Sequence, residues 1–550
     1  MNSLSNRQNS IQLLDLPDEL ILAIINKINP QVLLLASIIG IGNNRLERLA
    51  LDKCYSIDLS FYYSGFPYEE HMIRFLLDVM PRILNNIQSI TINLRHLSYL
   101  DHISREIHHE NLSKLSHLKI MTGHLYKNTG TPYTTILSID LWICLGYYYD
   151  NQLRHYPLFS IVPQFFYPSD SITNVLLSFF HNSLIMHSIV NFEYDDDCAL
   201  LVPSIDKGSL FPRSPHLTHV RVTLRKFDDC LRLLNQLGSQ LCSFAVSIIH
   251  VIKKDEDILS QIKSISCFKL KHLTMTIYRN IFHYERCIIP LLQHLTNIEH
   301  LILLLAIGVT DIGPDHFIDG SHLQRDIISY MPHLRQLDFH IRSIVRHAPY
   351  IELDTIRQTF VKQEQSIDCA LDYFNNEYGQ CQIYSLPFIG TRLDFISNRF
   401  PLFDDKNSFS NITILLLFDD IKSFENVFFE RLSRALPHLK TLEVFNQIEQ
   451  EEKSKTTNMI IEFHHLSVLI LHDIHVDYAE QLLCRSYLPC LIELVIRNNA
   501  LSTIIEQNNQ QARNNCSKVE TLQIVEPWIE LTSVHLKFFP HLHREIHDES

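Results

Sequence analysis

Apolar residues recur along most of the chain in the pattern apolar-x-x-apolar-x-apolar, usually just after a short polar or Pro-His turn. Twelve copies of this pattern are present in the sequence. They begin at Ile87, Leu115, Leu217, Leu241, Leu270, Ile298, Leu334, Ile412, Leu439, Leu466, Leu491 and Val519. The last five copies are 27, 27, 25 and 28 residues apart, which indicates one repeated unit of about 27 residues.

Each unit is predicted to be a short strand followed by a helix. The alternating apolar positions from Leu466 to Leu471 suit a strand with one buried face. Residues 227–237 have helical periodicity, and Gly238 follows where a helix end favours glycine. A period near 27 is too short for paired-helix repeats and falls within the range of about 20 to 29 residues that is typical of leucine-rich repeats. We therefore expect an α/β fold over residues 53–550, a curved solenoid with a parallel sheet inside and helices outside.

The period is interrupted twice. No clean copy lies between Leu115 and Leu217 or between Leu334 and Ile412. We expect degenerate repeats and irregular structure at about 122–210 and 342–411. The second stretch is predicted to contain a helix over 354–367, followed by short strands and turns.

The N-terminal segment has a different character from the repeats. Pro17 suits the first position of a helix, and Leu20, Ile24 and Ile28 form an apolar stripe along it. Two further short helices are predicted before residue 52. The resulting three-helix module, residues 12–52, carries more Leu and Ile than so small a core can enclose, so part of its apolar surface is expected to meet another protein. Residues 1–11, rich in Asn and Ser, are expected to form a disordered tail.

The segment Leu16-Pro17-x-Glu19-Leu20-x3-Ile24, followed by a second apolar helix, resembles the F-box. The resemblance implies docking on the Skp adaptor and, through it, on a cullin. An F-box followed by leucine-rich repeats is similar to the substrate receptors of Skp/cullin/F-box ubiquitin ligases. The residues that the resemblance places at the adaptor are Leu16, Pro17, Glu19, Leu20, Ile24, Leu33 and Leu34.

The second half of the module departs from that family, because its usual Cys-x-x-Trp stretch is replaced by Gly40-Ile-Gly-Asn-Asn-Arg-Leu46. A second interpretation of residues 12–52 therefore stays open. They would form only a helical cap that shields the first repeat, which every solenoid needs.

One face of the C-terminal strands is the predicted substrate surface. In each strand, the residues that flank the last apolar position point away from the core. From Ile302 onward these positions carry large apolar and aromatic side chains, which are typical of an interface when exposed. The candidate substrate-binding residues are Leu416, Phe418, Phe445, Ile470, His472 and Arg497. Alternatively, a segment from 342–411 folds over this face and buries it.

Composition excludes several classes of function. The 550 residues include 47 Lys and Arg against 61 Asp and Glu, a net charge of −14, and the basic residues are not clustered, which argues against nucleic-acid binding. The longest apolar runs are about half of the ~20 residues that a membrane-spanning helix needs. The N-terminus has no signal-peptide pattern, so we expect a cytoplasmic or nuclear protein.

No motif for catalysis, a metal or a cofactor is present. The spacings of phosphate-binding loops, zinc-protease helices and nucleophile elbows do not occur. Scattered residues such as Asp338, His340 and His472 are the only candidates for an undetected catalytic site. We therefore expect no enzyme, no catalytic residues and no cofactor. The sequence predicts a substrate receptor that binds the adaptor and an unknown protein substrate, with a repeat scaffold that has no ubiquitin-ligase role as the alternative.

Overall fold

The structure is a computed structural model. It describes residues 13–25, 38, 43–52, 56–59, 74–83, 87–106, 114–121, 170–194, 200, 202, 210–211, 214–251, 258–281, 283–308, 316–360, 366–374, 378–401, 409–451, 460–525 and 532–542. The chain divides into two compact units. The first comprises Met1–Leu301 with Tyr330–Gln336, and the second comprises Ile302–Ser329 with Leu337–Ser550.

The first unit begins with the short N-terminal module. A 3-10 turn, η1 (Leu13–Asp15), leads through Pro17 into helix α1 (Asp18–Ile25), which packs against α3 (Asn44–Asp52). The predicted first and third helices of the module are therefore present. The predicted second helix, including Leu33 and Leu34, lies outside the described residues apart from position 38, and so does the predicted tail 1–11.

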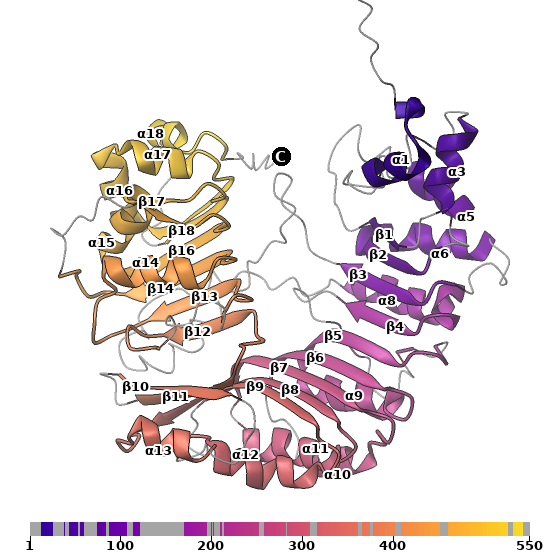
Figure 1. Ribbon diagram of the computed structural model, residues 1–550, viewed down its shortest axis with the longest axis horizontal. Helices are drawn as coiled ribbons and strands as arrows, with labels where there is room; N and C mark the ends of the chain where they lie inside the picture. The colour runs from indigo at the N-terminus through magenta and orange to yellow at the C-terminus, as the bar shows by residue number, and fades with distance from the viewer. Residues whose placement is uncertain are drawn as a thin grey trace, which may run out of the picture. The chain divides into compact units, whose positions relative to one another are not determined.

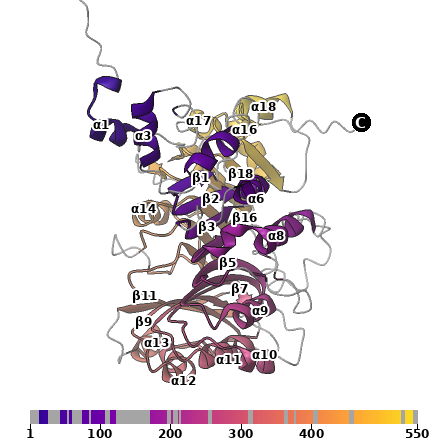
Figure 2. The same cartoon turned by 90° about the vertical axis from the view of Figure 1, so that its right-hand side faces the viewer.

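The rest of the first unit is a stack of strand–helix repeats (Figure 1). Its strands follow one another in the sheet in chain order, and each pairs in parallel with the next. The strands are β1 (Ser56–Leu59), β2 (Ser89–Asn93), β3 (His117–Met121), β4 (Asn191–Tyr194), β5 (His219–Lys226), β6 (Ser243–His250) and β7 (His272–Ile281). The helices and turns between and after them are η2 (Phe75–Val79), α5 (Met80–Ile83), η3 (Leu94–His96), α6 (Leu97–Glu106), α8 (Asp170–Asn182), η7 (Leu184–His187), α9 (Phe227–Leu237), α10 (Ile258–Ser264), η9 (Tyr284–Ile288) and α11 (Ile289–His294). In both views α8 and α9 lie on the same side of strands β3 to β7 (Figure 2).

The second unit contains two further groups of strands. The first group has the order β8-β9-β11-β10, and the second group is a parallel sheet with the order β12-β13-β14-β16-β18-β19. The strands are β8 (His300–Ile307), β9 (Gln336–Arg346), β10 (Ile367–Tyr373), β11 (Tyr378–Ser385), β12 (Arg392–Ile396), β13 (Ile414–Phe418), β14 (Thr441–Asn446), β16 (Val468–Ile474), β18 (Glu493–Arg497) and β19 (Thr521–Val525), with the short pair β15 (Ile461–Glu462) and β17 (Ser486–Tyr487). The helices are α12 (Gly320–Asp326), η10 (Ile328–Tyr330), α13 (Leu353–Gln358), α14 (Asn426–Ala435), α15 (Val476–Ala479), η11 (Glu480–Cys484), α16 (Asn498–Gln507), α17 (Gln510–Cys516) and α18 (Ser533–Phe538).

All twelve predicted copies of the pattern lead into strands of the structure, which confirms an α/β fold with a large parallel sheet built from repeated units. The strand register explains why the apolar positions recur with this spacing. Leu415 of β13 lies opposite Leu442 of β14, which lies opposite Leu469 of β16 and so on to β19. The apolar side chains of successive repeats thus form continuous buried rows, and no repeat closes its core without its neighbours.

The two interruptions of the period have different structures. In the first, β4 is a degenerate repeat whose Ile189, Phe192 and Tyr194 are buried in the usual positions. In the second, β10 and β11 pair antiparallel with each other, and β11 pairs antiparallel with β9. The expected helix over 354–367 is shorter than predicted and ends at Gln358. In the described part of 342–411, the departure from the repeat is a reversal of strand direction.

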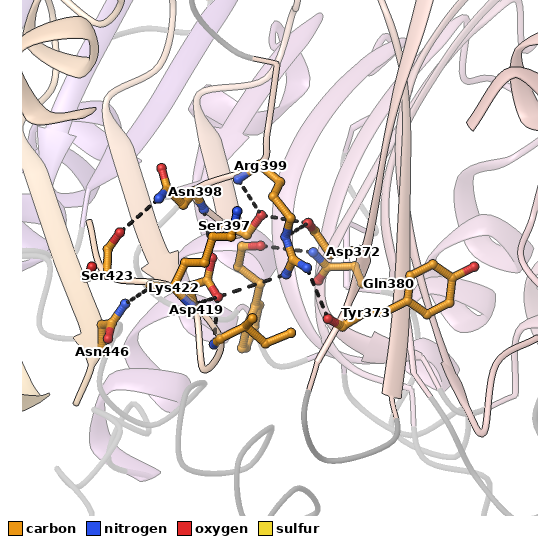
Figure 3. A network of polar contacts seen from close by, with 12 residues as sticks. Asp372, Tyr373, Gln380, Ser397, Asn398, Arg399, Asp419, Lys422, Ser423 and Asn446 are labelled. Atoms are coloured by element: carbon orange, nitrogen blue, oxygen red, sulfur yellow. Dashed lines mark hydrogen bonds and ion pairs between the residues drawn. The ribbon is translucent and has the colours of Figure 1, made fainter. Parts of the chain in front are cut away.

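Asp419 and Asn446, at the C-terminal ends of successive strands, join neighbouring repeats (Figure 3). Asp419, Asn446, Asp473 and Asn498 are 27, 27 and 25 residues apart. The buried Asn446 donates from Nδ2 to the carbonyl oxygen of Lys422 at 2.7 Å and accepts from the amide of Ile448 at 2.8 Å. These part-buried bonds satisfy a carbonyl and an amide of the turns. This second periodicity is visible in the sequence, but the prediction did not use it.

Replacement of Asn446 by Ala is expected to lower the free energy of unfolding by about 1 to 3 kcal/mol, because it removes two part-buried hydrogen bonds of this side chain. Urea denaturation monitored by circular dichroism measures the change. Gln510→Ala is the matched control, since Gln510 bonds only Asn514 on the exposed face of α17, and its effect should stay within about 0.5 kcal/mol. Equal stability of the two variants would contradict the proposed role of Asn446.

Candidate docking surface on the N-terminal helix

Apolar side chains lie in solvent on the first helix of the chain. The exposed fractions are 52% for Leu20, 39% for Ile24 and 41% for both Leu13 and Leu14. Pro17 is also exposed. A single exposed Leu is ordinary on a protein surface, but so many within one short segment form a patch of the kind that marks protein–protein contacts.

The predicted adaptor-binding residues that the structure describes lie on this one segment. Pro17, Glu19, Leu20 and Ile24 are exposed, and Leu16 is half-buried. Leu20 and Ile24 are one helical turn apart, so their side chains share one face of α1. Leu33 and Leu34, predicted to contribute from the second helix, lie outside the described residues.

Another residue on the same apolar side of α1 packs inward. Ile21 of α1 and Leu49 of α3 are buried, and α1 contacts α3. The helix is therefore packed through Ile21, while Leu20 and Ile24 beside it stay exposed. Full burial of a Leu or Ile side chain contributes roughly 1.5 to 3 kcal/mol, so covering these two side chains would be favourable.

Arg45, near the start of α3, holds the segment that leads into α1. Its Nη1 and Nη2 donate to the carbonyl oxygens of Leu14 and Leu16, both at 2.7 Å. Its Nε donates to Oδ1 of Asp18 at 2.8 Å. Sequence reasoning missed this residue, because its partners lie 27 to 31 residues earlier in the chain and no local pattern announces such a contact.

The predicted substrate surface has a different environment from the one expected. The exposed fractions are 1% for Leu416, 2% for Phe418, 6% for Phe445, 3% for Ile470 and 4% for His472. Only Arg497 among the six is half-buried. The strand register does bring them together, with Phe418 opposite Phe445, and Leu416 and Ile470 both opposite Glu443. The expectation that these side chains form an exposed stripe is wrong for the first five.

Side chains from the irregular stretch cover part of this face. The ring of Phe374, which follows β10, lies 5.1 Å from that of Phe418, and the ring of Phe395 in β12 lies 5.8 Å from it. Both residues belong to 342–411, the stretch named in the alternative prediction of internal coverage. For Phe418, these ring contacts agree with that alternative.

Phe374 and Phe395 are called the cover of this face, and polar contacts hold the residues around them in place (Figure 3). Ser397 donates to Oδ1 of the buried Asp372 at 2.6 Å, and Nε of Arg399 lies 3.2 Å from the same oxygen. Gln380 donates from Nε2 to the carbonyl oxygen of Phe395 at 2.9 Å. Burial raises the pKa of Asp372, while the bond from Ser397 and the charge of Arg399 oppose that rise. The carboxylate is thus placed among groups that stabilise its charge in a buried position.

The backbone at Phe395 is held in an unusual conformation. Its φ is 58°, in the left-handed region that residues with a side chain rarely adopt. A bulge in the pairing of β12 with β13 lies at the same place. The Arg342 guanidinium stacks over the Phe395 ring at 4.4 Å. This conformation costs about 1 to 3 kcal/mol and persists because the Gln380 bond and the packing of the ring compensate for it.

The three candidates for an undetected catalytic site, Asp338, His340 and His472, are buried. Nε2 of His340 lies 3.0 Å from Oε1 of Gln382, and burial lowers the pKa of His340 to about 4. His472 is equally buried, and its pKa is also lowered to about 4. Among the residues that the structure describes, no group of three or more His, Cys, Asp and Glu could hold a metal ion. None of the described helices is long and apolar enough to cross a membrane.

Comparison with known proteins adds two distant structural likenesses. No family model matches the sequence, and no curated protein matches it either. The yeast complex of Rad7 and Elc1 is 12% identical over 93% of this chain and 90% of its own, with a TM-score of 0.26. The leucine-rich repeat domain of APL1B is 12% identical over 65% of this chain and 84% of its own, with a TM-score of 0.19. At such scores these likenesses carry no argument, and the repeat architecture rests on the strand order and register described above.

The buried His472 should make the second unit sensitive to acid. Its folded-state pKa of about 4 lies below the ordinary value of 6.5, so the unfolded chain binds the proton first as the pH falls. The resulting stability is present above about pH 6.5 and is lost as the pH falls toward 4. Between pH 8 and pH 5 this residue alone accounts for a loss of about 2 kcal/mol.

His472→Leu is therefore expected to weaken the pH dependence of unfolding over that range by about 2 kcal/mol. Urea denaturation at pH 8, 6.5 and 5 measures it. His464→Leu is the control, because the side chain of His464 is 62% exposed and should leave the wild-type dependence unchanged. An unaltered pH dependence in His472→Leu would show that this imidazole is accessible to protons in the folded chain.

Proposed function

We propose that this chain is the substrate-recognition subunit of a Skp/cullin/F-box-type ubiquitin ligase. Residues 12–52 would bind the Skp-type adaptor, which links the chain to a cullin, and the repeats would bind a protein substrate. Of the residues that carry the resemblance to the F-box, Pro17, Leu20 and Ile24 have exposed apolar side chains. In this proposal the chain is not an enzyme and needs no cofactor, since catalysis belongs to other subunits.

The observation that carries the proposal is that the apolar side of α1 is only partly covered. Ile21 is buried, whereas Leu20 and Ile24 beside it are exposed. A helix that serves only to cap the first repeat needs no apolar residues outside its packed stripe. Exposed apolar residues next to a packed one are the feature that a helix needs when it packs inward and also binds a partner.

Five of the six candidate substrate-binding residues are buried. The role of Leu416, Phe418, Phe445, Ile470, His472 and Arg497 in substrate binding stays a prediction. Since Phe418 lies against Phe374 and Phe395, a substrate could contact it only after these rings move. The net charge of −14 argues against nucleic acid as the bound molecule and favours a protein.

The alternative is a repeat scaffold without a ubiquitin-ligase role. One contact favours it: Arg82 of α5 lies 3.4 Å from Glu47 of α3, so the module touches the first part of the repeat stack as a cap would. Capping and docking use different faces of the module, and adaptor binding distinguishes the two functions.

The double variant Leu20→Asp, Ile24→Asp is expected to abolish co-purification of the full chain with a purified Skp-type adaptor. Two buried apolar side chains contribute roughly 3 to 6 kcal/mol, so affinity should fall at least about 100-fold. Leu259→Asp is the matched control, because Leu259 of α10 is 54% exposed and lies outside the module.

Each outcome decides between the two functions. Loss of binding in the double variant, with binding retained in Leu259→Asp and unchanged circular dichroism in both, supports the F-box interpretation. Absence of binding by the wild-type chain, or equal binding by all three proteins, would remove the ubiquitin-ligase role and leave the capped scaffold.

A further inference from the structure

The segment in front of α1 is short and lies at the surface. Within Leu13–Pro17, a backbone bond runs from the amide of Leu16 to the carbonyl oxygen of Leu13, at 3.3 Å. The helical bonds begin afterwards, with the amides of Leu20 and Ile21 donating to Pro17. Leu13 and Leu14 are exposed, so their side chains add little apolar packing.

Arg45 of α3 binds this segment from across the module. Each of its three guanidinium nitrogens is used: Nη1 on Leu14, Nη2 on Leu16 and Nε on Asp18. Nη2 also lies 2.7 Å from the Asp18 carboxylate. The planar, forked guanidinium satisfies these partners in one fixed geometry, which a Lys ammonium on its flexible stem does not reproduce.

The position of Arg45 is itself determined by the start of α3. Oδ1 of Asn43 accepts from the amide of Arg45 at 3.2 Å and from the amide of Leu46 at 3.1 Å. Asn is a preferred residue at this position, since its side chain satisfies amides that the first helical turn leaves without partners. The contacts therefore run from the cap Asn43 through Arg45 to the exposed segment.

We propose that Arg45 is a positioning residue for adaptor docking, which holds Leu13–Asp18 in its binding conformation before the adaptor arrives. The proposal rests on the docking function proposed above and adds two claims to it. The docking surface extends in front of α1 to Leu13 and Leu14, and its order depends on a residue of α3 that itself lies outside the apolar patch. Arg45 occupies the Gly40–Leu46 stretch, where the sequence departs from the F-box pattern.

The expected effect follows from the population of the docking conformation. When only a fraction of molecules has the binding-competent conformation, the apparent Kd rises by the inverse of that fraction. If loss of the three Arg45 contacts leaves about one molecule in ten with an ordered segment, the Kd rises about tenfold. Binding is weakened but not abolished, unlike in the variant that places carboxylates in the apolar face.

The test measures the Kd of a purified Skp-type adaptor for the full chain by titration calorimetry, with Arg45→Lys and Arg45→Met as variants. Arg82→Lys is the matched control, because Arg82 also bonds a side chain of α3, Glu47, yet lies away from the exposed segment. Hydrogen exchange of the amides of residues 13–18 in the free chain is the second measurement. Exchange over 46–52 reports whether α3 stays folded.

The proposal expects a Kd that increases in the order wild type, Arg45→Lys, Arg45→Met, with exchange at 13–18 accelerated in the same order and exchange at 46–52 unchanged. Arg82→Lys should match the wild type in both measurements. A wild-type Kd in Arg45→Met, or unchanged exchange at 13–18, would overturn it.

Two further outcomes separate this proposal from the one on which it rests. If the wild-type chain does not bind the adaptor, the docking function fails, while hydrogen exchange still decides whether Arg45 orders the segment. If Arg45→Met unfolds α3, Asp18→Asn replaces it, since that variant weakens the Arg45 contact from the other side; an unchanged Kd in Asp18→Asn then counts against the proposal.

Discussion

Lateral burial of one repeat against the next is the constraint on which the rest of this protein depends. A single strand and helix of about 27 residues expose apolar side chains that they cannot cover, so each unit is stable only between its neighbours. The rows from Leu415 to Leu522, and the Asn and Asp side chains at the strand ends, are the two means by which the units are joined. The first buries apolar surface, and the second satisfies the backbone groups of the turns.

The same constraint bears on both candidate surfaces, the N-terminal helix α1 and the strand face of the second unit. At the N-terminus, the helical module touches the stack through Glu47 and Arg82, and it leaves Leu20 and Ile24 of α1 exposed. In the second unit, the face that should present large apolar residues to a partner is partly covered by the chain itself. The hairpin β10–β11 reverses the strand direction; Phe374, which follows β10 within it, and Phe395 of β12 lie against Phe418.

The cover differs from the core in its chemistry. The repeat core consists almost wholly of aliphatic and aromatic side chains, whereas the cover is joined by Asp372, Ser397, Arg399 and Gln380. Buried polar contacts of this kind contribute less net stability than apolar burial and depend on every partner being present. They also require a particular geometry, which here includes the left-handed backbone of Phe395.

The sequence by itself determined the period, the strand positions, the helical character of the N-terminal segment and the apolar side chains of α1. These features depend on spacing along the chain, since periodicity states which side of an element is apolar. The tertiary structure alone decided what lies against each face: the Arg45 contacts with Leu14, Leu16 and Asp18, the antiparallel hairpin, and the burial of Leu416, Phe418 and His472. An apolar position on a strand has the same spacing whether solvent, a partner or a distant segment of the chain covers it, and only contacts between residues far apart in the chain distinguish these cases.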